Sequence, residues 1–256
     1  MRLSVAVPLF VCAVVSPALA CAQSSPVSTT LQSALQAMVG KDSIQDVTLS
    51  GTAETIAGSS DETTPFTYQA TMAGSSRLEI PLSAGTLTEA CLVASTGPSG
   101  QWSRGDGVIH TMAQHNLLAG LGWAFPAIVV SKLLTDTTMA ASYVGLEGSL
   151  MHFSASGQLP GASQTAAALQ QHLTHIDIWL DASTLLPAKL SFNTHPTNNA
   201  ALDIPVSVEF SQYQAFGGVL LPSHVQKFLN NTLTLDLQMQ SATFNSGLPP
   251  TTFTIQ

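Results

Sequence analysis

The chain has 256 residues, a net charge of −8 and only 9% charged residues, against about a quarter in an average globular protein. So few Lys and Arg residues exclude nucleic acid and anionic membrane surfaces as partners. The length fits one domain with a sizeable core, or a sheet curved around a cavity.

The first 22 residues have the features of a secretory signal peptide. Met1 and Arg2 are followed by an apolar run at 3–15 and by small residues at 16–20 that suit cleavage. The sequence therefore predicts an exported protein, periplasmic or secreted, with one domain at 23–256. Lipid attachment at Cys21 is the alternative to plain secretion, because residues 18–21 resemble a lipobox. No later window is apolar enough to predict a transmembrane span.

Three cysteines are too few for a disulfide framework or a cysteine-built metal site. Cys12 leaves with the signal peptide. Cys91 is predicted to be buried, because free cysteine packs as a small hydrophobic residue. A Cys21–Cys91 bridge is the alternative.

A helix followed by several strands is predicted for the first third of the domain. Leu31, Leu35 and Met38 recur at helical spacing within 28–39, and Gly40 can end that helix. From residue 46 the apolar period changes to two, with Gly, Ser and Asp between the alternating runs. The pattern predicts an antiparallel meander of strands at 46–55, 66–72, 77–81, 87–93 and 101–104.

The most hydrophobic part of the mature chain is an insert that interrupts the strands after residue 104. Pro126 suits the first turn of a helix, which is predicted to run to Leu134 with Lys132 as its only charge. A segment so apolar is not expected to lie exposed. We therefore predict that it covers the apolar face of the sheet, either as a lid over a cavity or as part of a dry core.

Strand patterns resume after the insert, and an Ala-rich helix is predicted at 161–173. In the run at 176–181, Ile176, Ile178 and Leu180 fall on one face of an extended chain, and a turn follows at 181–184. The fold class is therefore mainly β with helices: one curved antiparallel sheet covered by two or three helices. The remaining strands are predicted at 142–146, 150–154, 176–180, 188–192, 205–215, 219–229 and 232–244, with a last short strand through Phe253 and Ile255.

No motif of a known catalytic chemistry is present, neither G-x-S-x-G nor H-E-x-x-H nor a phosphate-binding loop. His172 and His175 are three apart, but the helix is expected to end between them, so we expect surface or loop histidines rather than metal ligands. Asp177 and Asp181 are expected to face solvent. We therefore predict no catalytic residue, no metal and no cofactor. The other histidines are isolated or lie on different faces of a helix: His110, His115, His152, His195 and His224.

Two stretches resemble the LolA-like lipoprotein carriers, which are outer-membrane lipoprotein-sorting proteins and their lipid-binding relatives. Residues 178–192, IWLDASTLLPAKLSF, resemble their strand, D-x-x-T-x-L-P, strand hairpin, and residues 205–222 are similar to their F-x-x-Y…G-x-x-x-P strand pair. The resemblance covers roughly 28–256. It implies an incomplete barrel around an apolar cavity for acyl chains, with no catalysis, a lid at 123–134, a second cover at 161–173, and Arg77 as the nearest match to a lid-contacting arginine.

The leading hypothesis is an exported, non-enzymatic protein of the cell envelope that binds acyl chains of a lipid or a lipidated protein in an apolar cavity. The alternative is a structural or protein-interaction domain of the envelope with a dry-packed sheet and no ligand. The sequence leaves the oligomeric state open. Nine residues are expected to line or cover the cavity: Trp123, Phe125, Ile128, Val129, Leu133, Leu134, Ile178, Leu180 and Leu235.

Overall fold

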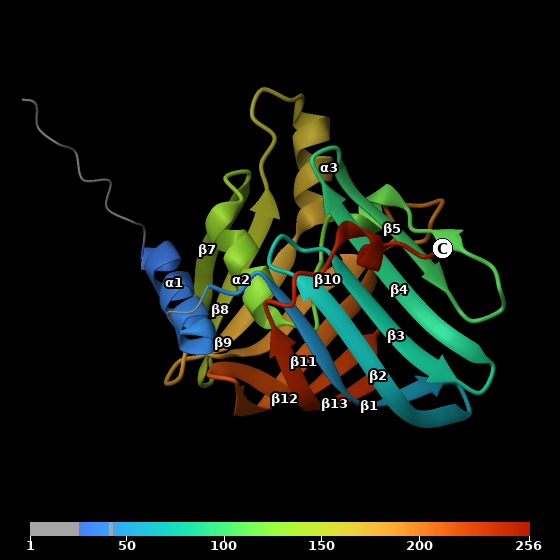
Figure 1. Ribbon diagram of the computed structural model, residues 1–256. Coiled ribbons are helices and arrows are strands. Elements are labelled where there is room, and N and C mark those ends of the chain that lie inside the picture. The colour runs from blue at the N-terminus through green and yellow to red at the C-terminus, as the bar shows by residue number, and fades with distance from the viewer. Residues whose placement is uncertain (1–25, 41–42) are drawn as a thin grey trace, which may run out of the picture.

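The protein is described from a computed structural model, which defines residues 26–40 and 43–256 (Figure 1). The predicted signal peptide, and Cys21 with it, lie outside the described residues. Within the described ranges, the helical elements are three α-helices and two short 3₁₀ turns: α1 (Pro26–Val39), α2 (Pro126–Thr135), α3 (Gln164–Thr174), η1 (Gln114–Leu117) and η2 (Pro250–Phe253).

All thirteen strands of the described residues belong to one antiparallel sheet. The strands are β1 (Asp46–Ala57), β2 (Ser60–Thr71), β3 (Ser76–Leu82), β4 (Gly85–Ala94), β5 (Gly97–Ser103), β6 (His110–Thr111), β7 (Met139–Glu147), β8 (Leu150–Gly157), β9 (Ile176–Asp181), β10 (Pro187–Thr194), β11 (Ile204–Phe216), β12 (Val219–Leu229) and β13 (Thr232–Phe244).

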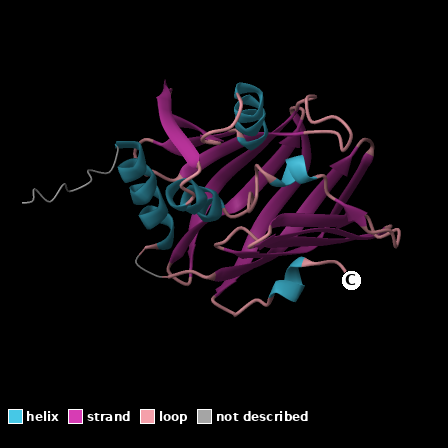
Figure 2. Ribbon diagram, turned by 90° about the horizontal axis from the view of Figure 1, so that it is seen from above, coloured by secondary structure: helices cyan, strands magenta, loops and turns pink. Residues whose placement is uncertain are grey.

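The sheet consists of two meanders that meet where β1 pairs with β13. Its order is β6-β5-β4-β3-β2-β1-β13-β12-β11-β10-β9-β8-β7, so β6 and β7 form the two edges although they are consecutive in the chain. The connection at 112–138, which contains η1 and α2, therefore has to run from one edge of the sheet to the other. Figures 1 and 2 show the sheet curved, with α1 and α2 side by side on its concave side.

The core lies on the concave face because the strands alternate between buried and exposed side chains. β9 buries Ile176, Ile178 and Leu180 and directs the residues between them outward. One packed face and one solvated face are usual for antiparallel sheets. The inward side chains of both meanders join those of α1 and α2 in one apolar cluster. The predicted curved antiparallel sheet, an incomplete barrel with helices on it, is confirmed.

The predicted final strand through Phe253 and Ile255 is wrong. That segment contains η2, and Phe253 packs into the protein from it. Pro249 and Pro250 precede Phe253, and proline cannot donate a backbone hydrogen bond to a neighbouring strand. The segment is held instead by Arg77, whose guanidinium donates to the carbonyls of Thr252 and Thr254. Arg77 therefore contacts the C-terminal segment and not the α2 region that the resemblance implied.

Two further details differ from the sequence-based prediction or complete it. The helix predicted at 161–173 is α3, with Ser163 as its N-cap, but it buries only Leu173 and Thr174 and packs against β8. Cys91 is buried and free, as predicted, and burial raises the pKa of its thiol to about 11. Among the described residues, no helix combines the length and apolar character that crossing a bilayer requires.

Candidate ligand-binding site on the concave face

The segment that crosses the concave face, residues 119–135, is called here the α2 segment. Two tight turns lead into α2, in which Trp123 N donates to Gly120 O and Phe125 N donates to Gly122 O. Gly122 has a φ of +72°, and a Cβ there would lie 2.6 Å from Cγ2 of Ile128. Only glycine fits both the backbone conformation and the close approach. Pro126 then begins the helix at a position where its missing N–H costs nothing.

Most side chains of the α2 segment are apolar and buried, whereas Ser131 and Lys132 are half-buried and Thr135 is exposed. Phe125 and Val130 are 0% exposed and Leu133 is 8% exposed. A helix with so wide an apolar surface has to be covered on more than one side. Here α1 covers one side of α2 and the concave face of the sheet lies on another.

The structure brings all nine predicted site residues together in the apolar core. Eight of them are buried, and Leu134 packs against the cluster while partly exposed. Six come from the α2 segment, Ile178 and Leu180 come from β9, and Leu235 comes from β13. These residues belong to one apolar cluster inside the hollow of the sheet, although Leu235 follows even Leu134 by 101 positions in the chain.

Two described pockets lie elsewhere on the protein. One, of about 470 Å³, is lined by Gln69, Arg77, Glu79 and residues of the C-terminal segment. The other, of about 290 Å³, lies around Pro81 and residues 65–67. None of the nine predicted residues lines either pocket. The role of the nine as a ligand-binding lining therefore stays a prediction.

Polar groups that the sequence analysis did not select lie on the same concave face. Nζ of Lys227 lies 4.5 Å from the ring centroid of Trp123 and 3.8 Å from Oε2 of Glu89. The ring of Tyr68 lies 6.4 Å from that of Trp123, and burial raises the pKa of the Tyr68 hydroxyl. One signal in the sequence could have identified Lys227. It lies two residues after Val225, so it is a charged residue at a position where the alternation of β12 predicts an apolar side chain.

The outer face of the sheet carries a polar cluster around His152. Its Nδ1 lies 2.8 Å from Glu147 and its Nε2 lies 2.9 Å from Asp177, and its ring stacks on Trp179 at 4.2 Å. Asp177 therefore faces outward, as predicted, but is paired with His152. Asp181 accepts hydrogen bonds from its own turn.

A Ser-His-Asp arrangement is also present on the outer face. Oγ of Ser211 lies 3.2 Å from Nδ1 of His224, whose Nε2 lies 2.8 Å from Oδ2 of Asp236. Acyl transfer also requires a substrate cleft and donors for an oxyanion. None of the three residues lines a described pocket, and their side chains interact across neighbouring antiparallel strands. The arrangement is that of cross-strand polar pairs on a sheet surface.

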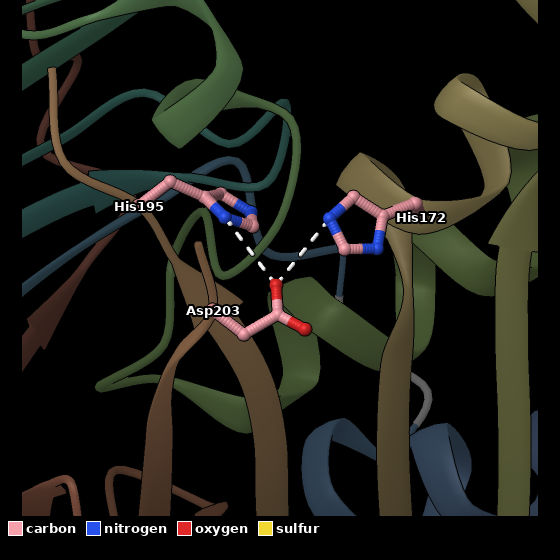
Figure 3. A group of neighbouring side chains, drawn as sticks. All are labelled: His172, His195 and Asp203. Carbon is pink, nitrogen blue, oxygen red and sulfur yellow. Dashed lines mark ion pairs between the residues drawn. The ribbon is translucent and has the colours of Figure 1, made fainter. Parts of the chain in front are cut away.

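The histidines near α3 behave only partly as the sequence suggested. α3 ends at Thr174 and β9 begins at Ile176, so His172 and His175 do not share a helical face, as predicted. His195, which looked isolated, instead lies with His172 and Asp203 in a group of potential metal ligands (Figure 3). The sequence interpretation of His195 was wrong because these three residues are neighbours only after β10, β11 and α3 have folded together.

No protein-family model matches the chain, and no curated protein matches it either. Solved structures do match. A domain described as that of an outer membrane lipoprotein-sorting protein from Vibrio parahaemolyticus is 8% identical with a TM-score of 0.54, covering 88% of this chain and 95% of its own. A DUF1329 family protein from Desulfovibrio piger is 9% identical with a TM-score of 0.55, covering 90% of this chain and 98% of its own. At these identities the likeness concerns the fold, and the predicted resemblance in fold to lipoprotein-sorting proteins is confirmed.

Proposed function

We propose that the chain is an exported protein of the cell envelope that binds acyl chains of a lipid or a lipidated protein between the α2 segment and the concave face of the sheet. The observation that carries this proposal is how the α2 segment is held. Among the described residues, the backbone–backbone hydrogen bonds recorded for it stay within the segment or cap its end at Asp136. Apart from the Lys227–Trp123 contact, it is attached to the sheet by apolar side chains.

Such a cover can leave the sheet without breaking any hydrogen bond between the strands. Opening exposes six large apolar side chains of the segment, at a cost of about 1.5–3 kcal/mol each, or roughly 9–18 kcal/mol. An acyl chain of about 16 carbons that takes their place contributes about 13 kcal/mol at ~0.8 kcal/mol per CH₂. The two terms are of similar size, so exchange of the segment for an acyl chain is close to balanced.

The fold of the Vibrio parahaemolyticus domain supports the same assignment, because that domain is described as part of a lipoprotein-sorting protein. The predicted signal peptide agrees with a location in the envelope. Lys227 and Glu89 supply polar groups beside Trp123, where the polar end of an amphipathic ligand can be placed.

The second candidate is a domain with a dry core that serves a structural or protein-interaction role without a ligand. The close packing of the predicted site residues favours it, as does the position of the two described pockets away from them. In that case the α2 segment is a permanent part of the core.

Trp123 offers a direct test, since the chain has only two other tryptophans, Trp102 and Trp179. Replacement of both by Phe leaves Trp123 as the only reporter inside the concave face. Titration with palmitate is expected to shift the emission of Trp123 in a saturable way. Native mass spectra of protein exported with its own signal peptide are expected to show bound lipid, which extraction then identifies. Unchanged emission together with ligand-free protein would establish the dry-core alternative.

A further inference from the structure

The geometry points to a binding site for a divalent transition-metal ion at the end of the sheet where the β10–β11 loop meets α3. We propose that His172, His195 and Asp203 are its ligands. His172 comes from the last turn of α3, while His195 and Asp203 stand at the two ends of the loop between β10 and β11. Figure 3 shows both imidazole rings directed at the same carboxylate oxygen. The site is independent of the proposed acyl-chain function.

The distances between the potential ligand atoms fit a small coordination sphere. Nε2 of His172 lies 3.3 Å, and Nδ1 of His195 lies 3.4 Å, from Oδ1 of Asp203. Zinc–ligand bonds of about 2.0–2.1 Å in a tetrahedron place the ligand atoms about 3.3–3.4 Å from one another. All three ligand atoms lie within 4.8 Å of one another. The two distances to Oδ1 of Asp203 already match those of a tetrahedral site, and a small movement of His172 brings the two imidazole nitrogen atoms to the same separation.

Unpaired nitrogen atoms are the second, independent observation. Nε2 of His172 is buried at the centre of the group without a hydrogen-bond partner, and so is Nε2 of His195 on the far side of its ring. The side chain of His195 is 1% exposed. Buried polar atoms of native proteins nearly always have a partner. A metal ion at the centre of the group provides one for Nε2 of His172. Nδ1 of His195, which also lies 3.2 Å from the carbonyl oxygen of Leu202, would exchange that contact for the ion.

The surroundings hold the buried ligand in place. The backbone N–H of His195 donates to Oδ1 of Asn116, whose amide donates back to the carbonyl of His195. His115 contacts the carbonyl of Pro196. These contacts fix the loop against η1, in the way that outer-shell hydrogen bonds orient metal ligands. Asp203 is 44% exposed, so an ion can enter from solvent and a water molecule can complete the coordination.

The donor set selects the class of metal. Two imidazoles and one carboxylate suit Zn²⁺ and its neighbours Co²⁺, Ni²⁺ and Cu²⁺. Ca²⁺ and Mg²⁺ prefer six or more oxygen donors, and the group offers too few.

The test uses the mature protein freed of any purification tag and of bound metal. Titration with Zn²⁺ in a calorimeter is expected to show one saturable site per chain, and Co²⁺ is expected to give visible absorption typical of tetrahedral coordination. His172→Gln and Asp203→Asn should each weaken Zn²⁺ binding at least tenfold. These two residues are partly exposed, so their replacement is compatible with folding, unlike that of buried His195.

His175→Gln is the matched control, because His175 lies at the same α3–β9 junction, 3.6 Å from a carboxylate oxygen of Asp177, but outside the group. Its Zn²⁺ affinity should equal that of the original protein. Equal affinities in all variants, or no saturable binding of Zn²⁺, would overturn the proposal.

Discussion

Lys227 on β12 and Glu89 on β4 meet across the hollow of the sheet, with 3.8 Å between Nζ and Oε2. Their strands are five spacings apart in the sheet order, which is about 24 Å along a flat sheet at ~4.8 Å per strand. The contact is therefore a measure of how strongly the sheet curves. It also places the ammonium group of Lys227 against the ring of Trp123, where it joins the α2 segment to both halves of the sheet.

This contact is expected to add little to stability. Glu89 is 40% exposed, and exposed ion pairs contribute at most about 1 kcal/mol. Glu89→Gln should therefore lower the free energy of unfolding by less than about 1 kcal/mol, while Lys227→Met also removes a cation–π contact of about 0.5–1 kcal/mol. Urea unfolding of both variants and of the double variant measures the coupling. A loss above ~2 kcal/mol for Glu89→Gln would contradict the prediction.

Ile128→Asp tests whether the α2 segment is a lid or a permanent part of the core. Ile128 is 1% exposed, and an unpartnered charge at such a position costs several kcal/mol when the site stays closed. For a lid, the segment can swing out, so fatty-acid binding should be lost while the melting temperature falls only slightly. For a core element, the melting temperature should fall steeply. Thermal unfolding and binding of a fluorescent fatty acid are measured on the same variant.

Leu146→Asp is the control for that experiment, because Leu146 on β7 is 60% exposed and outside the apolar cluster. It should change neither stability nor binding. If Ile128→Asp behaves in the same way as this control, the α2 segment is neither lid nor core.

Local patterns were sufficient to predict most of the fold. Alternation in 176–180 and 232–244 marked strands with one apolar face, and Pro126 marked the start of α2. Prolines 249 and 250 carried a local signal against the last strand that the alternation of Phe253 and Ile255 obscured. The nine apolar residues predicted to line or cover a cavity could be placed inside the protein, because side chains of that kind are rarely left exposed together.

The polar groups could not be predicted from the sequence, because their partners lie far away in the chain. Lys227 meets Glu89 only after the sheet has curved. His195 meets His172 and Asp203 only after α3 has packed beside the β10–β11 loop. In both cases the contact depends on strand order, which a single sequence does not contain.

Gly51 should tolerate no side chain. It lies at the register shift between β1 and β13, and a Cβ there would stand 1.9 Å from the carbonyl oxygen of Gln238. Gly51→Ala must therefore separate the strands that join the two meanders, and we expect a loss of more than about 2 kcal/mol in unfolding free energy. Gly145 also lies beside a register shift but has open space around it. Gly145→Ala should be neutral or slightly stabilising in the same urea titration.

The turn at Asp181 should make stability depend on pH in the acid range. Oδ1 of Asp181 accepts hydrogen bonds from the hydroxyl and backbone N–H of both Ser183 and Thr184. These bonds, the one from the Ser183 hydroxyl first, lower the pKa of Asp181 to about 2 from its ordinary 3.8. Because the folded-state pKa lies below the unfolded one, this stabilisation is complete above pH ~4 and is lost as the pH falls toward ~2.

Asp181→Asn removes this titration while preserving the shape of the side chain. Its melting temperature should be lower than that of the original protein at pH 5, and the two should converge as the pH approaches 2. Asp106→Asn is the control for an Asp-to-Asn change in another exposed turn, where the carboxylate accepts one backbone hydrogen bond. If the difference in melting temperature between the original protein and Asp181→Asn stays constant from pH 5 to pH 2, the D-x-x-T turn does not couple protonation to folding.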